Sequence, residues 1–339
     1  MRSRRSTLGL FRDAVLLSSA AWAASPLLAA RRAKRSAALL VPLTGDRSAL
    51  GLSIANAARL AETDAAALSV IDTGGSAAGA VRAAQAAVKG GATMLLGPLS
   101  ADETRAVAAA VVVPVVALTN DAGARGGGAF VFGITPAQAA SAILGYARSR
   151  GIRRVLAVDD GSPWSRASVA AAKAAETDLG LSITVVPVTN GTLPAGVEGD
   201  AAFVPGAAVA LAPTLKARGI QLLATVQALD YRADAVGALE GAWIASPDPD
   251  RFATFATEYA ARNGGRPGAI AALGNDAAMI AKTLREADAM TREGVLRDAG
   301  FDGVTGRVRF RSDGSCARDF AILVPTNGVY QKVAESRGA

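Results

Sequence analysis

The chain has 339 residues, of which 51% are hydrophobic and 19% charged, and its formal net charge is +7. This composition excludes wholesale disorder, and the length is enough for two ordinary domains. The arginines are scattered along the chain and form no stripe, so we expect no nucleic-acid partner.

Residue counts restrict the chemistry further. The sequence contains no histidine and a single cysteine, Cys316. Catalytic triads with histidine, the commonest zinc sites and an internal disulfide are therefore excluded. The glycine pairs fit no phosphate-binding pattern. We predict that the protein is not an enzyme and uses neither a metal nor a cofactor.

The amino terminus resembles an export signal. A basic segment ending near Arg12 precedes an apolar run over residues 14–30. Small residues predict cleavage after residue 23 or 30, so residues 1–30 form the expected signal peptide. Arg4 and Arg5 resemble a twin-arginine signal. An uncleaved membrane anchor is the alternative, but serines and a proline interrupt the run. We expect a soluble periplasmic protein without a lipid-bearing cysteine.

Strands and helices then alternate regularly. The expected strands are 37–43, 68–71, 93–96, 111–118, 129–134, 155–158, 182–188, 201–204, 221–226 and 239–245. Such alternation predicts two α/β units, each with a mainly parallel sheet covered by helices on both faces. Two helices, 251–263 and 269–288, lead to a β tail with hairpin turns at Asp313-Gly314 and Asn327-Gly328.

The stretch from Gly90 to Asp121 predicts one wall of a binding site. Its first strand breaks at Gly97-Pro98, a helix starts behind Ser100, and the second strand ends in Thr119-Asn120-Asp121. Both strands end at the carboxyl edge of the sheet, where open α/β folds bind small ligands. The helix amino terminus adds N–H groups that suit a carboxylate.

We therefore select Ser100 and Thr119 as candidates for binding a ligand carboxylate, with Leu99, Ala117 and Asn120 beside them. Hydroxyl groups and N–H groups are the donors that a carboxylate needs. Two alternatives stay open. Ser100 can act only as a helix cap, and residues 119–121 can serve only as a turn.

The second unit offers fewer candidates. Trp164 follows a strand-end loop and can stack on a ligand, or it can be an aromatic residue at the hinge or the surface. Gln227 and Asp160 are weaker candidates, selected only because they lie at strand ends on the expected cleft side. The segment Asp72–Gly75 favours a turn over a site.

The order of these motifs resembles the type I periplasmic solute-binding proteins, in the branch that binds leucine, isoleucine and valine. The resemblance covers nearly all of the chain after the signal. It depends on motifs at Leu50-Gly51, Gly97–Ser100, Pro114–Ala117, Phe132–Thr135 with Gln138, and Phe301–Gly314. Within that superfamily, three stretches are similar to the penicillin-binding-protein activators: Ala202–Gly206, Gly241–Pro249 and Val304–Arg311.

The resemblance implies two lobes with a ligand cleft between them and three segments that cross from one lobe to the other. We expect the crossings near Gly133–Pro136, Ser246–Asp250 and Phe310–Asp313. Lobe 1 then comprises residues 37–134 and 250–310, and lobe 2 residues 135–249 and 311–336. The chain departs from the family in two respects. Residues 188–201 form a short loop where a crossover helix is usual, and the ligand cradle has few aromatic residues.

Two functional hypotheses follow. The first is an exported solute-binding protein that closes on a small polar molecule, such as an amino acid, and delivers it to a membrane transporter. The second is an envelope protein that contacts a penicillin-binding protein and regulates peptidoglycan synthesis. The cleft-edge turns favour the first, and the subgroup resemblance favours the second.

Overall fold

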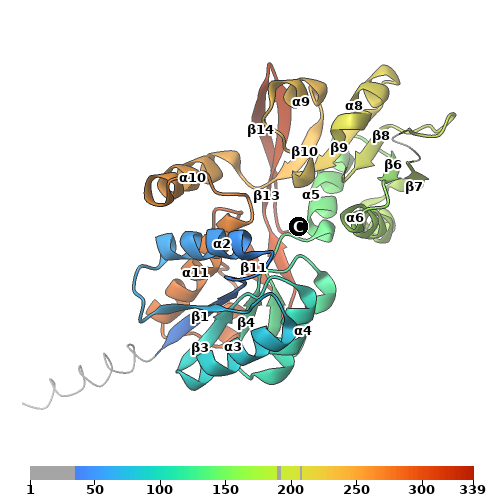
Figure 1. The fold of residues 1–339 in the computed structure, drawn as a ribbon. Helices are drawn as coiled ribbons and strands as arrows, with labels where there is room; N and C mark the ends of the chain where they lie inside the picture. The colour runs from blue at the N-terminus through green and yellow to red at the C-terminus, as the bar shows by residue number, and fades with distance from the viewer. Residues whose placement is uncertain (1–34, 189–191, 207) are drawn as a thin grey trace, which may run out of the picture.

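The structure is a computed structural model that describes residues 35–188, 192–206 and 208–339. These residues form two lobes, each built around a β-sheet flanked by helices (Figure 1). The predicted two-lobed α/β architecture is confirmed. The predicted signal peptide and twin-arginine pair lie outside the described residues.

Lobe 1 contains a five-stranded parallel sheet with the order β2-β1-β3-β4-β5. Its strands are β1 Ser36–Val41, β2 Leu68–Asp72, β3 Ala92–Leu96, β4 Val115–Ala117 and β5 Ala129–Val131. Both faces are buried. In β1, Leu39 and Val41 belong to one core cluster, whereas Ala38 and Leu40 belong to another on the opposite face. A strand buried on both sides explains the continuous apolar runs in the sequence.

Helices cover both faces of this sheet. Those of lobe 1 are α2 Ser48–Ala61, α3 Ala77–Lys89, α4 Ala101–Ala110, η1 Ala122–Ala124, α10 Pro249–Asn263, α11 Ala271–Glu286 and α12 Arg292–Val295. Helices α3 and α4 contribute to the cluster with Leu40, and α2 and α11 to the cluster with Leu39. Helix α10 packs through Phe255 and Tyr259 against Ala57 of α2. Two helices distant in the sequence, α10 and α11, therefore complete lobe 1.

Lobe 2 contains a seven-stranded sheet with the order β14-β13-β10-β9-β8-β6-β7. Its strands are β6 Arg154–Asp159, β7 Ser182–Pro187, β8 Ala201–Val204, β9 Gln221–Thr225, β10 Trp243–Ser246, β13 Phe320–Thr326 and β14 Val329–Ser336. The sheet is parallel except for the hairpin of β13 and β14. The hairpin turn at Asn327-Gly328 has positive φ at both residues, 53° and 80°, as a two-residue hairpin loop requires.

The helices of lobe 2 are α5 Pro136–Ser149, α6 Pro163–Ala174, α7 Glu176–Leu179, α8 Ala208–Ala217, η2 Val226–Ala228 and α9 Ala233–Ala238. The sequence did not predict α9. Strand β10 accordingly begins at Trp243 and not at residue 239, because α9 and a turn at Gly241 (φ 83°) precede it. Between β7 and β8 the described residues contain no helix, consistent with the short loop expected there.

Within the described residues, three segments connect the lobes. The first leads from β5 to α5 and the second from β10 to α10. The third differs from the prediction of Phe310–Asp313. Strands β11 Val308–Phe310 and β12 Cys316–Arg318 pair with each other, and both Phe310 and Cys316 are buried in the lobe 1 core. The chain therefore passes into lobe 2 at Asp319, and residues 311–318 lie with lobe 1.

Candidate ligand-binding site

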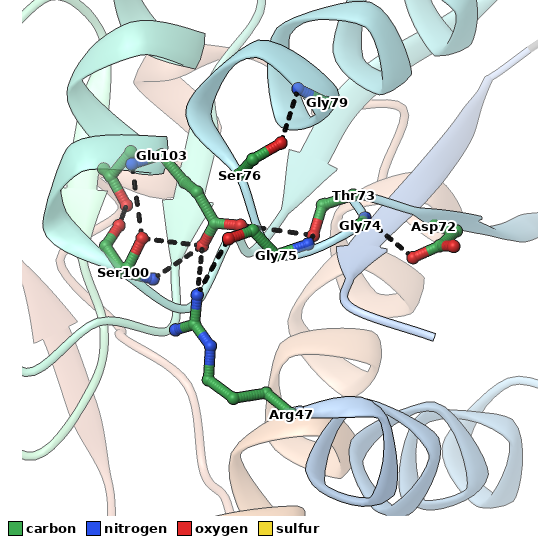
Figure 2. A network of polar contacts seen from close by, with 10 residues as sticks. Arg47, Asp72, Thr73, Gly74, Gly75, Ser76, Gly79, Ser100 and Glu103 are labelled. Atoms are coloured by element: carbon green, nitrogen blue, oxygen red, sulfur yellow. Dashed lines mark hydrogen bonds and ion pairs between the residues drawn. The ribbon is translucent and has the colours of Figure 1, made fainter. Parts of the chain in front are cut away.

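Three turns meet at the carboxyl edge of the lobe 1 sheet, after β1, β2 and β3 (Figure 2). Asp72, the last residue of β2, accepts hydrogen bonds from the Leu43 N–H (2.7 Å), the Thr44 hydroxyl (2.7 Å) and the Gly74 N–H (2.8 Å). These bonds, above all that from Thr44, lower the pKa of the Asp72 carboxyl below its ordinary value of 3.8. The turn after β1 is thereby fixed to the turn after β2.

Glu103, in the first turn of α4, is the central acceptor of this edge, and its side chain is only 2% exposed. Its Oε2 accepts the Ser100 N–H at 3.1 Å and the Ser100 hydroxyl at 2.7 Å, while Oε1 accepts the Thr73 hydroxyl at 3.2 Å. Nη2 of Arg47 lies 4.0 Å from Oε2 and donates to the Gly75 carbonyl at 3.2 Å. Figure 2 shows these groups from separate turns converging on one carboxylate.

Ser100 uses its hydroxyl inside the protein. Its Oγ accepts the Glu103 backbone N–H at 3.3 Å and donates its proton to the Glu103 carboxylate. The pair forms a capping box, in which the cap and the third helical residue satisfy each other's backbone N–H groups. The structure therefore shows the capping arrangement that the sequence left open.

The other predicted residues of lobe 1 differ in exposure. Thr119 is buried, and its Oγ1 accepts the Asp121 N–H at 3.2 Å. Ala117 is buried within β4, and Leu99 is partly buried against the lobe 1 core. Asn120 is exposed. Asn120 is thus the one of these four residues that is exposed to solvent.

Thr225 connects the two predicted residues of lobe 2. It lies buried at the end of β9, where its hydroxyl donates to the Pro205 carbonyl at 3.0 Å. The same Oγ1 accepts the indole N–H of Trp164 at 3.3 Å and the Gln227 N–H at 3.4 Å. The structure thus brings Trp164 and Gln227 together at one sheet edge, with the Gln227 side chain exposed.

A cavity of about 380 Å³ lies next to this edge and is shared by the two lobes. We call it the lobe-bridging cavity. Its lining consists of Val226, Leu229 and Tyr231 from lobe 2, Ser246, Pro247 and Pro249 from the second crossing, and Phe252, Arg266, Pro267 and Ala269 from lobe 1. The lining side chains are apolar apart from Ser246, Arg266 and the hydroxyl of Tyr231. An apolar cavity with few polar groups is typical of small-molecule sites.

Tyr231 is the most exposed aromatic residue of this lining, at 69%. Its ring packs edge-to-face on the ring of Tyr330 in β14, with centroids 5.3 Å apart. The Tyr330 hydroxyl donates to the Asp230 carbonyl at 2.8 Å and accepts the Asp230 N–H at 3.2 Å. The loop that carries Tyr231 is therefore held on the sheet while its ring stays accessible.

A larger cavity, of about 510 Å³, lies between the second and third crossings. Its lining contains both acidic and basic side chains, among them Asp248, Arg251, Arg307, Asp319 and Glu335. Its lining begins with Asp248, two residues after the carboxyl end of β10, and it contains more charged side chains than the lobe-bridging cavity. None of the seven predicted ligand residues lines either cavity, although Gln227 directly follows Val226 of the lobe-bridging cavity.

Buried charges connect the crossings. Arg318 is fully buried and its guanidinium donates to the Thr305 carbonyl (3.1 Å), the Thr305 hydroxyl and the Phe132 carbonyl, which lies just before the first crossing. Asp276 of α11 accepts the Val304 N–H (2.7 Å), the Thr305 N–H (2.8 Å) and the Thr305 hydroxyl (2.6 Å). Burial raises the pKa of Asp276 above 3.8, against the lowering effect of these bonds and of the Arg318 charge.

Sequence reasoning missed several of these groups. Glu103 had a local signal, because serine followed three residues later by glutamate is the capping-box pattern. Tyr231, Phe252 and Arg318 had none, since their surroundings come from distant parts of the chain.

Two further properties concern the part of the chain that the structure describes. No group of three or more acidic or cysteine side chains is placed to hold a metal ion there. Within the same residues, no helix is long and apolar enough to span a membrane.

Comparisons with known proteins identify the family. A model of the periplasmic binding protein family matches residues 36–328. The chain belongs to the periplasmic binding protein family. The predicted resemblance is thereby confirmed. A search of curated proteins finds no match.

Solved structures of other periplasmic binding proteins and of a regulator share the fold. A protein described as a branched-chain amino acid ABC transporter from Rhodospirillum rubrum has 20% identity and a TM-score of 0.76, over 88% of this chain and 99% of the other. The C-domain of LpoA from Haemophilus influenzae, a regulator of PBP1A, has 18% identity and a TM-score of 0.73, over 88% and 100%. LivJ from Streptococcus pneumoniae, in complex with isoleucine, has 17% identity and a TM-score of 0.59, over 89% and 99%.

Proposed function

We propose that this protein is an exported solute-binding protein that closes its two lobes on a small molecule with an apolar portion, and delivers it to a membrane transporter. The lobe-bridging cavity is the observation that carries the proposal. Its walls come from both lobes, so a molecule held there contacts both and favours the closed form over the open one. Its volume of about 380 Å³ suits a ligand of amino-acid size.

A thermal-shift screen of the protein without residues 1–30 tests this function. The panel contains leucine, isoleucine, valine, phenylalanine and leucinamide. A compound that binds only the folded protein raises its melting temperature. We expect at least one member to do so, because the cavity lining, with Tyr231 and Phe252, offers apolar surface to such a side chain.

Variants locate the binding. Tyr231→Ala and Phe252→Ala each remove an aromatic wall and should weaken binding about tenfold, the equivalent of about 1.4 kcal/mol. Val185→Ala is the matched control, because Val185 is 46% exposed on β7, away from the cavity lining. Loss of the thermal shift in the control would count against this cavity as the binding site. So would a thermal shift that persists in both aromatic variants.

Export is part of the proposal. Replacing both Arg4 and Arg5 by lysine should leave the precursor in the cytoplasm if the twin-arginine pathway is used. Cell fractionation followed by immunoblotting measures this, and an unchanged amount of periplasmic protein would exclude that pathway.

A second candidate function is regulation of peptidoglycan synthesis through contact with a penicillin-binding protein, as the likeness to the PBP1A regulator suggests. One observation favours it. The hydroxyl groups of Ser100 and Thr119, selected for an amino-acid carboxylate, are both engaged within the protein. Surface plasmon resonance against a purified penicillin-binding protein of the same cell tests this function. Binding there, with no thermal shift from any panel member, would favour regulation over transport.

A further inference from the structure

Four arginines line the cavity of about 510 Å³ between the second and third crossings, which we call the crossing cavity. Arg251 lies in the first turn of α10, Arg307 and Arg309 lie before and within β11, and Arg337 directly follows β14. All four residues are exposed to solvent. Because α10 and β11 belong to lobe 1 and β14 belongs to lobe 2, segments from both lobes bring these side chains to one cavity.

The alternation of side chains along β11 explains two of these positions. Val308 and Phe310 are buried in the core of lobe 1. Successive side chains of a strand point to opposite faces, so Arg307 and Arg309 lie on the face away from this core. Ala317, which pairs with Arg309 across the hairpin of β11 and β12, lines the crossing cavity as well. The pattern that buries one face of β11 therefore directs two guanidinium groups to the cavity.

The guanidinium groups have few partners within the protein. Arg251 and Arg307 each donate one hydrogen bond to a backbone carbonyl, at 3.1 Å and 2.6 Å. Among the described residues, Arg309 and Arg337 make no hydrogen bond, and none of the four arginines forms an ion pair. A guanidinium has five N–H donors in a fork that matches phosphate and carboxylate groups. Most of these donors are therefore available to an anion, which would also reduce the repulsion between the arginines.

Two of the four carboxylates that line the crossing cavity are paired with one lysine. The Lys332 ammonium donates to Asp248 and to Glu335, at 2.6 Å in each case. The hydrogen bond from Lys332 is the main cause that lowers the pKa of the Glu335 carboxyl, and the Arg337 charge adds a smaller effect. Both carboxylates thus have a cationic partner within the protein.

The other two carboxylates of the lining are Asp319 and Asp302. Asp319 accepts the Gly338 N–H at 2.8 Å, whereas Asp302 is exposed. With Lys332 the cavity has five cationic and four acidic side chains, a surplus of one positive charge. Hydrogen-bonding capacity therefore decides the ligand class more than net charge does. Three of the four carboxylates already accept bonds, and most of the arginine donors do not make any.

We propose that the crossing cavity binds a small polyanion, a molecule with at least two phosphate or carboxylate groups, through these four arginines. Several anionic groups are needed because the guanidinium groups come from three separate segments of the chain. The described linings of the crossing cavity and the lobe-bridging cavity have no residue in common. The polyanion site goes beyond the proposed function and does not depend on it.

Thermal unfolding of the purified protein tests the site. The salts are sodium pyrophosphate and sodium citrate, each at about 10 mM, and sodium chloride at equal ionic strength and pH. We expect pyrophosphate, citrate or both to raise the melting temperature by about 3 °C above chloride, the size for a ligand about tenfold above its dissociation constant. The larger of the two shifts identifies phosphate or carboxylate as the preferred group. Equal melting temperatures in all three salts would overturn the proposal.

A double variant locates the effect. Arg309→Gln with Arg337→Gln removes two exposed guanidinium groups that make no hydrogen bond, so the protein should fold and the shift should fall below about 1 °C. Arg166→Gln with Arg262→Gln is the matched control, because it removes the same charge from exposed residues outside the cavity lining. A full shift in the first variant, or loss of the shift in the control, would overturn the proposal.

Asp302→Asn should act in the opposite direction. Its carboxylate lines the cavity and repels an anion, so its neutralisation should strengthen polyanion binding about threefold. Isothermal titration calorimetry with the probe that gives the larger thermal shift measures this. A purely structural role of the arginines predicts no such gain. An affinity that falls or stays unchanged in Asp302→Asn would overturn the assignment of the polyanion to this cavity.

Discussion

Replacing Arg318 by methionine should destabilise the protein more than an ordinary core substitution. The side chain is fully buried, donates three hydrogen bonds to Thr305 and Phe132, and lies with its guanidinium 4.8 Å from the centre of the Phe132 ring. Methionine retains most of the volume but removes the charge that lowers the pKa of the buried Asp276. Removing one partner of a buried charge pair costs about 3–5 kcal/mol.

The loss in free energy of unfolding caused by Arg318→Met should depend on pH in a defined direction. Burial raises the pKa of Asp276 in the folded protein above its ordinary 3.8, so this group opposes folding as pH rises through the raised value. Without Arg318 the folded pKa rises further. The cost of Arg318→Met should therefore be smallest at low pH, where protonation of Asp276 is favoured, and should grow towards pH 7.

Urea unfolding at pH 4, 5.5 and 7, followed by circular dichroism, measures this cost. With a slope of about 3 kcal/mol per molar urea, a loss of about 4 kcal/mol lowers the pH 7 midpoint by about 1.3 M. Arg318→Lys keeps the charge but loses the planar fork, so it should lie between wild type and Arg318→Met. A cost for Arg318→Met below about 1 kcal/mol at pH 7, or a cost independent of pH, would refute the reasoning.

Three further substitutions have expected effects on urea unfolding. Asp72→Asn should cost about 1 kcal/mol at pH 7, and the cost should shrink as pH falls towards the lowered folded pKa, because the folded protein favours the ionised form; a cost that does not shrink on acidification would contradict this. Gly133→Ala should cost about 3 kcal/mol, because its Cβ would lie 2.2 Å from the Thr119 carbonyl oxygen; an unchanged midpoint would contradict that contact. Trp164→Phe should cost about 1 kcal/mol through the lost bond to Thr225, and a wild-type midpoint would show that the bond contributes nothing.

The lobes were predictable because their signals are local. Strands such as 37–41 and 92–96 are apolar throughout, since helices cover both faces of a parallel sheet, and this pattern is visible in the sequence. The third crossing was not predictable in the same way. The ring of Phe310 packs edge-to-face on the ring of Phe130, with centroids 5.4 Å apart, and its centroid lies 5.9 Å from that of Phe132. These contacts hold the hairpin of β11 and β12 on lobe 1. Nothing in the sequence around Phe310 shows which lobe it joins.

In the candidate site, too, features set by neighbouring residues were predictable, whereas features set by distant residues were not. The cap formed by Ser100 follows from its own neighbours, and the sequence already offered that interpretation. The full environment of Glu103 requires Thr73 and Arg47, which belong to other strand–helix units. The lobe-bridging cavity likewise joins Tyr231 and Phe252 across a crossing. Only the folded chain brings such groups together.

Solution X-ray scattering tests the central claim, that a small molecule closes the two lobes, most directly. The sample is the protein without residues 1–30, alone and saturated with whichever panel compound gives the largest thermal shift. We predict that the radius of gyration falls on binding towards about 19 Å, the value for a compact chain of about 300 residues. An unchanged radius of gyration at saturation would contradict lobe closure, and the absence of any thermal shift across the panel would contradict the binding itself.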